Sequence, residues 1–390
     1  MHHHDQATKR SEHSQQPHLS FRMPSFTMPL LLFGALPLIL FYIPTLIEPY
    51  ALWNPKVLNS RDTSDGRITA WCNMGWWKNT DIFSEAAEAL AGKLLRLAQE
   101  GGYQGGGNVL DIGHGAGESL LLHLSQENPP GQLHALTSLS SDTAVSKALV
   151  KSVYPDTSTR VQFYTFSAQF RPGKDVGHPL DPMRGFLGEQ SSQRFFEEDQ
   201  STERKELADE PPEDKPQSSS KYDLVYILDS IYHYPPSIPS FLASLRSALH
   251  SSSLVVYTDI LPPPDLSKIN AYLLSRLLSV PMPNLTSRPR NLEEYKAQLG
   301  SQGWEDVAVE DWSDGVWNGF SNALKTRGGM WSLVGRAIKV AEENGWKFIG
   351  VRARKGAMCR LRHKDAFIHG RGCNAIGRTI DTTILTTIMR

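Results

Sequence analysis

The stretch VLDIGHGAGE, residues 109–118, joins an apolar segment to three closely spaced glycines. The residues from 108 to 112 predict a buried strand, and the Leu-rich residues 120–124 predict a helix. Glycines between a strand end and a helix start let a ligand approach the backbone closely, at the carboxyl edge of a sheet. The stretch therefore predicts a cofactor-binding loop in an open α/β fold.

The spacing of the glycines separates two classes of cofactor. A dinucleotide fingerprint, G-x-G-x-x-G counted from Gly113, would place its third glycine at Glu118, where a carboxylate would oppose the pyrophosphate. The spacing here is G-x-G-x-G, through Gly115 and Gly117, with Asp111 two residues ahead of the loop. This pattern favours a cationic ligand without phosphate and disfavours a nicotinamide oxidoreductase.

Strand and helix signals alternate on both sides of this loop. A helical pattern over 83–97 precedes it, and helices are also expected at 266–278, 292–302 and 331–344. Further strands are expected at 132–137, 161–166, 222–228, 254–258 and 346–353. Such alternation predicts an α/β fold with a doubly wound, mainly parallel sheet covered by helices on both faces.

Composition narrows the class of protein further. The chain has 390 residues, 40% hydrophobic and 21% charged, which excludes collagen, coiled coil and full disorder. A net charge of -1 argues against nucleic acid as a partner. Cys72, Cys359 and Cys373 cannot form a disulfide framework and have no paired metal-ligand spacing, so we expect a reducing compartment and no metal.

Several segments lie outside the α/β pattern. Residues 1–22 read as a disordered leader. Residues 23–48, which are uncharged as far as Ile47, read as a hydrophobic membrane-anchor helix, with a buried terminal arm as the alternative. The domain is expected over 60–355, with a disordered insertion at 171–220 and a basic tail at 356–390. These assignments predict a membrane-associated protein whose α/β domain is cytosolic.

The glycine loop at 109–118 resembles motif I of the class I S-adenosylmethionine-dependent methyltransferases. Four further stretches agree with the small-molecule and lipid branch of that family, which includes tocopherol, sterol and cyclopropane-fatty-acid methyltransferases: NMGWW at 73–77, LTSLS at 136–140, YDLVYILDSIYHYP at 222–235, and NLEEY at 291–295 followed by GWEDV at 303–307. The resemblance implies a Rossmann-like fold with an antiparallel last strand.

The resemblance also implies a set of cofactor-binding residues for S-adenosyl-L-methionine. Gly113, Gly115 and Gly117 form the bed, and Asp111 either orders the loop or reaches the amino-acid end of the cofactor. Ser138 faces the ribose at a position where many relatives have an acid, and its hydroxyl binds more weakly. Trp77, with Trp76, either walls the sulfonium or belongs to the core.

Two residues after the fourth expected strand are candidates for catalysis. An acceptor hydroxyl or acidic carbon needs a base, and His233 or Asp229 is in the matching position of the motif. A hydrogen-bonded structural histidine is an equal alternative for His233, and Asp229 can instead cap the next turn or contact the cofactor.

With the resemblance, these residues predict in-line methyl transfer to a small, apolar or amphipathic acceptor, either a small molecule or a lipid-like compound. The protein is expected to contact a membrane through residues 23–48 and to bind neither nucleic acid nor metal. The alternative is a non-catalytic, membrane-tethered scaffold. It is motivated by Ser138 in place of the ribose acid and by His114 inside the glycine loop.

Overall fold

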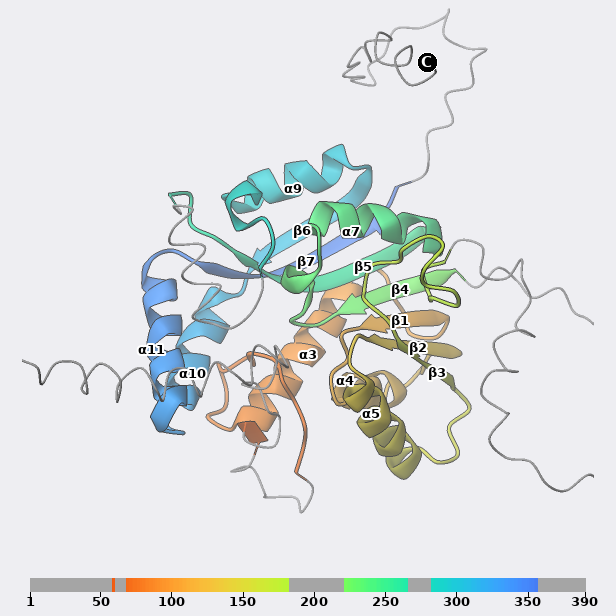
Figure 1. Cartoon of the computed structure of the whole chain (residues 1–390), viewed down its shortest axis with the longest axis horizontal. Helices are drawn as coiled ribbons and strands as arrows, with labels where there is room; N and C mark the ends of the chain where they lie inside the picture. Colours follow the sequence, from red (N-terminus) through yellow and green to blue (C-terminus); the bar gives the residue numbers. More distant parts are fainter. Residues whose placement is uncertain (1–57, 60–67, 182–220, 266–281, 357–390) are drawn as a thin grey trace, which may run out of the picture.

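The computed structural model describes residues 58–59, 68–181, 221–265 and 282–356, which are built around one twisted sheet (Figure 1). Within these residues the sheet has seven strands in the order β3-β2-β1-β4-β5-β7-β6. Their bounds, in that order, are Arg160–Thr165, Gln132–Thr137, Asn108–Ile112, Tyr222–Ile227, Leu249–Leu261, Lys347–Lys355 and Trp304–Asp311. The strands from β3 to β5 are parallel, and β7 runs antiparallel to both β5 and β6. The predicted mainly parallel sheet with an antiparallel last strand is confirmed.

Helices cover both faces of the sheet and define two hydrophobic cores (Figure 1). One core contains apolar residues of α3 (Phe83–Glu100), α4 (Glu118–Leu124) and α5 (Ser140–Val153). The other contains residues of α7 (Ile238–Leu245) and α9 (Leu292–Ser301). Because both faces are covered, the central strands are apolar nearly throughout, as parallel strands in α/β folds are.

Two helices near the C-terminal end of the described chain form a separate pair, α10 (Ser313–Lys325) and α11 (Gly329–Glu343) (Figure 1). They approach closely at Gly335, where a Cβ would lie 2.6 Å from the backbone oxygen of Ser321, and the Ser321 hydroxyl donates to the Gly335 carbonyl at 2.7 Å. Their apolar faces join the core that contains α3. The two helices therefore pack tightly on each other and on the core at the α3 face of the sheet.

The structure extends the sequence-based assignment at the C-terminal half. Strand β5 is longer than the expected 254–258 because β7 pairs with it from Leu254 to Leu261. Strand β6 and helix α10 were not assigned from the sequence, since β6 is an edge strand with exposed acidic residues and little alternation. Helix α9 begins as expected, with the Asn291 side chain accepting from the Glu294 amide at 2.8 Å. The helix expected at 266–278 lies outside the described residues.

The expected membrane association needs correction. In the part of the chain that the structure describes, no helix is long and apolar enough to cross a bilayer. Helix α3, with 18 residues, carries charged side chains along its length and buries only one face. This finding contradicts the predicted membrane localisation. The segment 23–48, to which the anchor helix was assigned, lies outside the described residues, as do 1–22 and 357–390.

The predicted insertion is described in part. Residues 171–181 pack onto the domain, with His178 and Leu180 buried and Arg171 paired with Asp175 at 2.7 Å. Residues 182–220 lie outside the described residues. The first eleven residues of the predicted insertion, 171–181, thus belong to the described domain.

Candidate functional site

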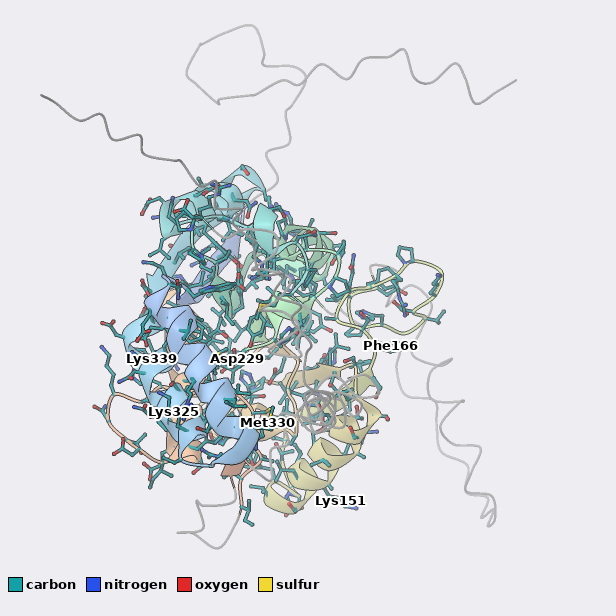
Figure 2. The ribbon with its side chains drawn as sticks, turned by 60° about the vertical axis from the view of Figure 1, so that its left-hand side comes forward. Lys151, Phe166, Asp229, Lys325, Met330 and Lys339 are labelled. Carbon is teal, nitrogen blue, oxygen red and sulfur yellow. The ribbon has the colours of Figure 1, made fainter. Side chains whose placement is uncertain are left out.

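A cavity of about 600 Å³ lies at the carboxyl ends of β1, β2 and β4 and extends to helices α10 and α11. Its size falls within the ~300–1,000 Å³ typical of small-molecule sites. Figure 2 shows Asp229 near the centre of the molecule beside the α10–α11 pair, with Phe166 on the opposite side, and both line the cavity. Five predicted site residues meet here: Gly113, Gly115, Ser138, Asp229 and His233. Asp111, Gly117 and Trp77 are not among its lining residues.

The three glycines of the loop after β1 have different functions. A Cβ at Gly113 would lie 2.4 Å from the Ser230 hydroxyl oxygen, and one at Gly117 would lie 2.7 Å from the Cβ of Ser146. Gly115, with φ +54°, has no atom within 4 Å of its would-be Cβ. The first and third glycines therefore permit close packing, whereas the middle one faces open space in the cavity wall.

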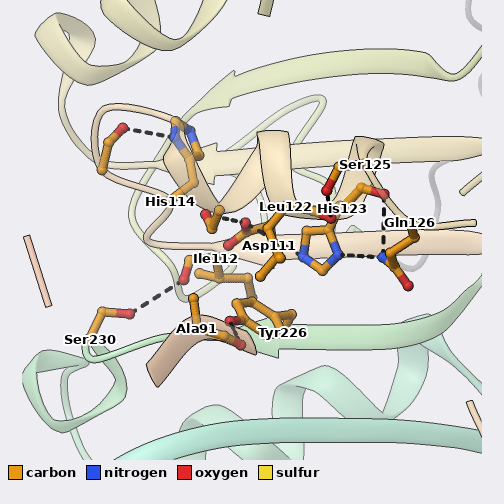
Figure 3. Close-up of polar contacts among 12 residues, drawn as sticks. Ala91, Asp111, Ile112, His114, Leu122, His123, Ser125, Gln126, Tyr226 and Ser230 are labelled. Atoms are coloured by element: carbon orange, nitrogen blue, oxygen red, sulfur yellow. Dashed lines mark hydrogen bonds and ion pairs between the residues drawn. The ribbon is translucent and has the colours of Figure 1, made fainter. Parts of the chain in front are cut away.

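Asp111 lies behind the glycine loop (Figure 3). Its Oδ2 accepts from the Ser119 hydroxyl at 2.6 Å and lies 3.8 Å from His123 Nε2. Burial raises the pKa of Asp111 to about 7 and lowers the pKa of His123 to about 4, so the imidazole is neutral at physiological pH. Through Ser119 the carboxyl group fixes the first turn of α4, which fits the loop-ordering interpretation.

Asp229 follows β4 with a left-handed backbone, φ 53°. Its Oδ2 accepts from the Met74 amide and its Oδ1 from the Tyr232 hydroxyl, both at 2.7 Å. The Asp229 amide in turn donates to the Thr258 hydroxyl oxygen at 2.7 Å. Burial raises the pKa of this carboxyl to about 6. The cavity wall thus holds, in a fixed orientation, a proton acceptor that is ionised at neutral pH.

The short helix η2 (Ile231–His233) places His233 on the cavity wall. The His233 ring stands edge-on to Tyr232 with centroids 4.1 Å apart. From behind, Arg288 donates to the Tyr232 carbonyl at 3.1 Å and to Asp259 Oδ1 at 2.9 Å. A buried ion pair therefore anchors the loop that carries both predicted catalytic residues.

Two further carboxylates line the cavity, and the sequence analysis did not assign them to the site. Glu118 at the start of α4 accepts from the Ala70 amide at 2.8 Å, and Asp142 lies in the first turn of α5. Cys72 also lines the cavity. An acid four residues after Ser138, in the first turn of the next helix, was the available signal for Asp142.

His114 contributes a hydrogen-bond acceptor. Its Nδ1 lies 2.9 Å from the Gly115 carbonyl oxygen, so Nδ1 carries the proton and donates. Burial lowers the pKa of the ring to about 4 and keeps it neutral. Its Nε2 lone pair has no hydrogen-bond partner within the described residues, and the residue lines the cavity. A buried lone pair of this kind is suited to an N–H or O–H of a ligand.

Trp77 belongs to the packing around α3 and α10. Its indole N–H donates to the Met74 carbonyl at 2.7 Å, and its ring lies against Gly319 and 6.1 Å from Phe83, centroid to centroid. Trp76 is also not among the lining residues; Lys93 lies over its ring, 4.6 Å from the centroid. Of the tryptophans, Trp71, Trp317 and Trp346 line the cavity instead.

Comparison with known proteins gives matches among solved structures. No family profile and no curated protein matches the chain. A geranyl diphosphate methyltransferase solved with GPP and sinefungin is 12% identical, with a TM-score of 0.51 over 80% of this chain and 99% of that one. The geranyl diphosphate C-methyltransferase of Streptomyces coelicolor A3(2) is 11% identical, covering 78% and 95%, with a TM-score of 0.49. The phosphoethanolamine N-methyltransferase 2 of Haemonchus contortus is 15% identical, covering 68% and 53%, with a TM-score of 0.45.

The first of these similarities shows the fold. The chain has the Rossmann-like fold of the S-adenosylmethionine-dependent methyltransferases, with the five parallel strands β3-β2-β1-β4-β5 extended by the antiparallel strands β7 and β6. A shared fold leaves the activity to be argued from the site itself.

Proposed function

We propose that this protein is an S-adenosylmethionine-dependent methyltransferase that acts on a small acceptor with a largely apolar body. The observation that carries the proposal is the single cavity in which the open Gly115 position, Ser138 and the Asp229 carboxylate meet. The geranyl diphosphate methyltransferase of the same fold, solved with GPP and sinefungin, supports a site for a cofactor analogue and a small acceptor together.

The donor set fits this cofactor. Glu118, Asp142 and Asp229 supply negative charge to a cavity wall that must accept a sulfonium and an amino group. His114 Nε2 and the Ser138 hydroxyl offer partners to hydroxyl and amine hydrogens. Glu118, in the position of the third dinucleotide glycine, opposes a pyrophosphate. When bound, the cofactor supplies an electrophilic methyl group.

The chain's own residues supply alignment and proton transfer. Asp229, held by the Met74 amide and the Tyr232 hydroxyl, is oriented to accept a proton from an acceptor atom in the cavity. His233 borders the same space and can pass that proton to solvent. Trp317 and Phe320 of α10 form an apolar wall that excludes water from the reacting atoms.

The non-catalytic scaffold is not supported. That hypothesis rested partly on Ser138, which stands where many relatives have an acid that binds the ribose. However, Asp142, in the first turn of α5, places a carboxylate in the lining of the same cavity. His114 inside the loop is neutral and offers a lone pair to a ligand.

Calorimetric titration of the full chain with S-adenosylmethionine tests the proposal. Gly115→Leu places a side chain into the open space of the cavity and should abolish binding. Gly173→Leu is the matched control: Gly173 also has a positive φ (+74°) and no atom within 4 Å of its would-be Cβ, but it does not line the cavity. The control should bind as the wild-type chain does. Absence of binding by the folded wild-type chain would overturn the proposal.

A further inference from the structure

The cavity has two walls of different chemistry. The strand-end wall carries the glycine loop and the acidic residues. The opposite wall is apolar and is formed largely by side chains of α10, α11 and the segments beside them, namely Leu58, Met282, Trp317, Phe320, Ile338 and Trp346. An acceptor that reaches Asp229 must therefore lay its body against hydrocarbon and indole surface.

In the described part of the chain, the charged side chains that line the cavity are all acidic. Three carboxylates line it, and among its lining residues in the described part of the chain there is no Lys or Arg. S-adenosylmethionine carries one net positive charge, since its sulfonium and ammonium groups outweigh its carboxylate. With the cofactor bound, the described lining residues retain an excess of negative charge, which attracts a cation and repels an anion.

Three cationic side chains of segments around the cavity contact other protein groups. Arg288 is paired with the buried carboxylate of Asp259. Lys93 lies 4.6 and 4.5 Å from the ring centroids of Trp76 and Trp312, near Glu310. Arg327 donates to the carbonyls of Leu58 and Ala323. Charge-assisted donors of this kind bind phosphate strongly only when they point at the ligand.

We propose that the acceptor is an apolar amine and that phosphorylated or otherwise anionic acceptors are excluded; this rests on the methyltransferase function proposed above. The ammonium group of the acceptor gives a proton to the Asp229 carboxylate, from which it passes to solvent. The amine lone pair then forms an N–C bond to the methyl group as the S–C bond breaks. The products are the neutral thioether S-adenosylhomocysteine and the methylated ammonium.

Three probes with one carbon skeleton test the assignment: geranylamine, geraniol and geranyl phosphate. Each is titrated into the full chain, with and without saturating S-adenosylhomocysteine, and methylated products are identified by mass spectrometry. We expect the amine to bind at least tenfold more tightly than the alcohol and a hundredfold more tightly than the phosphate. We also expect the amine to be N-methylated.

A positive charge placed on the apolar wall should narrow the difference between the amine and the phosphate. Ala341→Lys puts a cation on a lining position of α11 and should improve binding of the phosphate at least tenfold while weakening the amine. Val340→Lys adds the same charge to the neighbouring position, which is 55% exposed and outside the cavity, and should change neither.

The outcomes separate the two proposals. A chain that binds S-adenosylhomocysteine but takes the phosphate as tightly as the amine overturns the amine assignment alone. A folded chain that binds geranylamine but no S-adenosylhomocysteine overturns methyl transfer, and with it the role of the amine as an acceptor.

Discussion

Two loops at neighbouring strand ends form the polar side of the cavity, and they are built on opposite principles. The loop after β1 takes its shape from missing side chains, since Gly113 and Gly117 let Ser230 and Ser146 approach closely. The loop after β4 takes its shape from polar side chains, in which Tyr232 holds Asp229 and Arg288 holds the Tyr232 carbonyl.

The buried acids behind the loops differ in the same way. Asp111, behind the glycine loop, has a hydroxyl partner and a neutral histidine. Asp259, behind the second loop, has the guanidinium of Arg288 and the hydroxyl of Tyr295 at 2.8 Å. A loop built from backbone presents surface for a cofactor to lie on, whereas a loop built from side chains presents groups that can move a proton.

The ion pair behind the second loop should give the largest effect on stability. Arg288→Met leaves the Asp259 carboxylate, 1% exposed, without its counterion, and we expect a loss of about 3–5 kcal/mol in the free energy of unfolding. Urea denaturation measures it. Lys339→Met, which breaks the half-exposed pair with Glu342, is the control and should lower the free energy of unfolding far less. Equal losses would show that the buried pair does not anchor the loop.

Removal of the proton acceptor should be the next largest effect. Asp229→Asn retains the shape of the side chain but loses the basic oxygen, so methyl transfer should slow by about 100-fold or more. In the wild-type protein the rate should rise with pH through about 6, because burial raises the pKa of Asp229 to about 6 and the carboxylate is the active form. A pH profile of kcat/KM checks this. An acid limb that persists unchanged in Asp229→Asn would assign proton transfer to another group.

Asp111, behind the loop after β1, should make the free energy of unfolding depend on pH. The pKa of Asp111 is raised from 3.8 to about 7, so the folded state binds more protons than the unfolded state in this window. The contribution of Asp111 to stability therefore falls as pH rises from about 4 to about 7. Asp111→Asn removes that slope, and relative to wild type it should gain about 2–3 kcal/mol between pH 5 and pH 7.

Measured unfolding free energies at the two pH values decide the point. If wild type and Asp111→Asn lose stability in parallel, Asp111 is already ionised throughout this range. The two loops would then not differ in the charge state of their supports.

A smaller change should tune the second loop without dismantling it. Tyr232→Phe removes the hydrogen bond to Asp229 Oδ1, which lowers the pKa of Asp229 in the wild-type protein. The acid limb of the rate profile should therefore move to higher pH, by about one unit, since a hydrogen bond to a charged group contributes about 1.5 kcal/mol. A purely structural role for Tyr232 would lower the rate at all pH values and leave the limb in place.

The sequence predicted the parallel half of the fold better than the rest. Strands β1, β2 and β4 were assigned nearly to the residue, since buried parallel strands are short apolar runs between turn signals. Strand β6 was not predicted from the sequence. An edge strand needs no alternation of apolar residues, and β6 pairs with β7, a strand that lies more than 30 residues further along the chain. Helix α10 was not assigned from the sequence either, although its Trp317 and Phe320 line the cavity.

The residues of the candidate site show the same contrast between positions in loops after parallel strands and positions on helices. Gly113, Gly115, Ser138, Asp229 and His233 were predicted from motifs that resemble a known family. They line one cavity because they lie in loops after parallel strands, which end at one edge of the sheet. Glu118 and Asp142 reach the cavity from first turns of helices, and the apolar wall comes from helices more than 80 residues beyond β4. Such placements depend on how helices pack, which local pattern does not record.

The sequence by itself determined the class of fold and the kind of loop, because glycine spacing and strand periodicity are local consequences of backbone sterics and burial. The tertiary structure decided the charge of the cavity and the state of its acids. In the folded chain, three carboxylates line the cavity and Arg288 is paired with Asp259. Asp111 lies behind the glycine loop, where it accepts a hydrogen bond from Ser119. A pKa and a cavity's net charge depend on which groups meet in space and how much water remains between them, and only the packed chain fixes both.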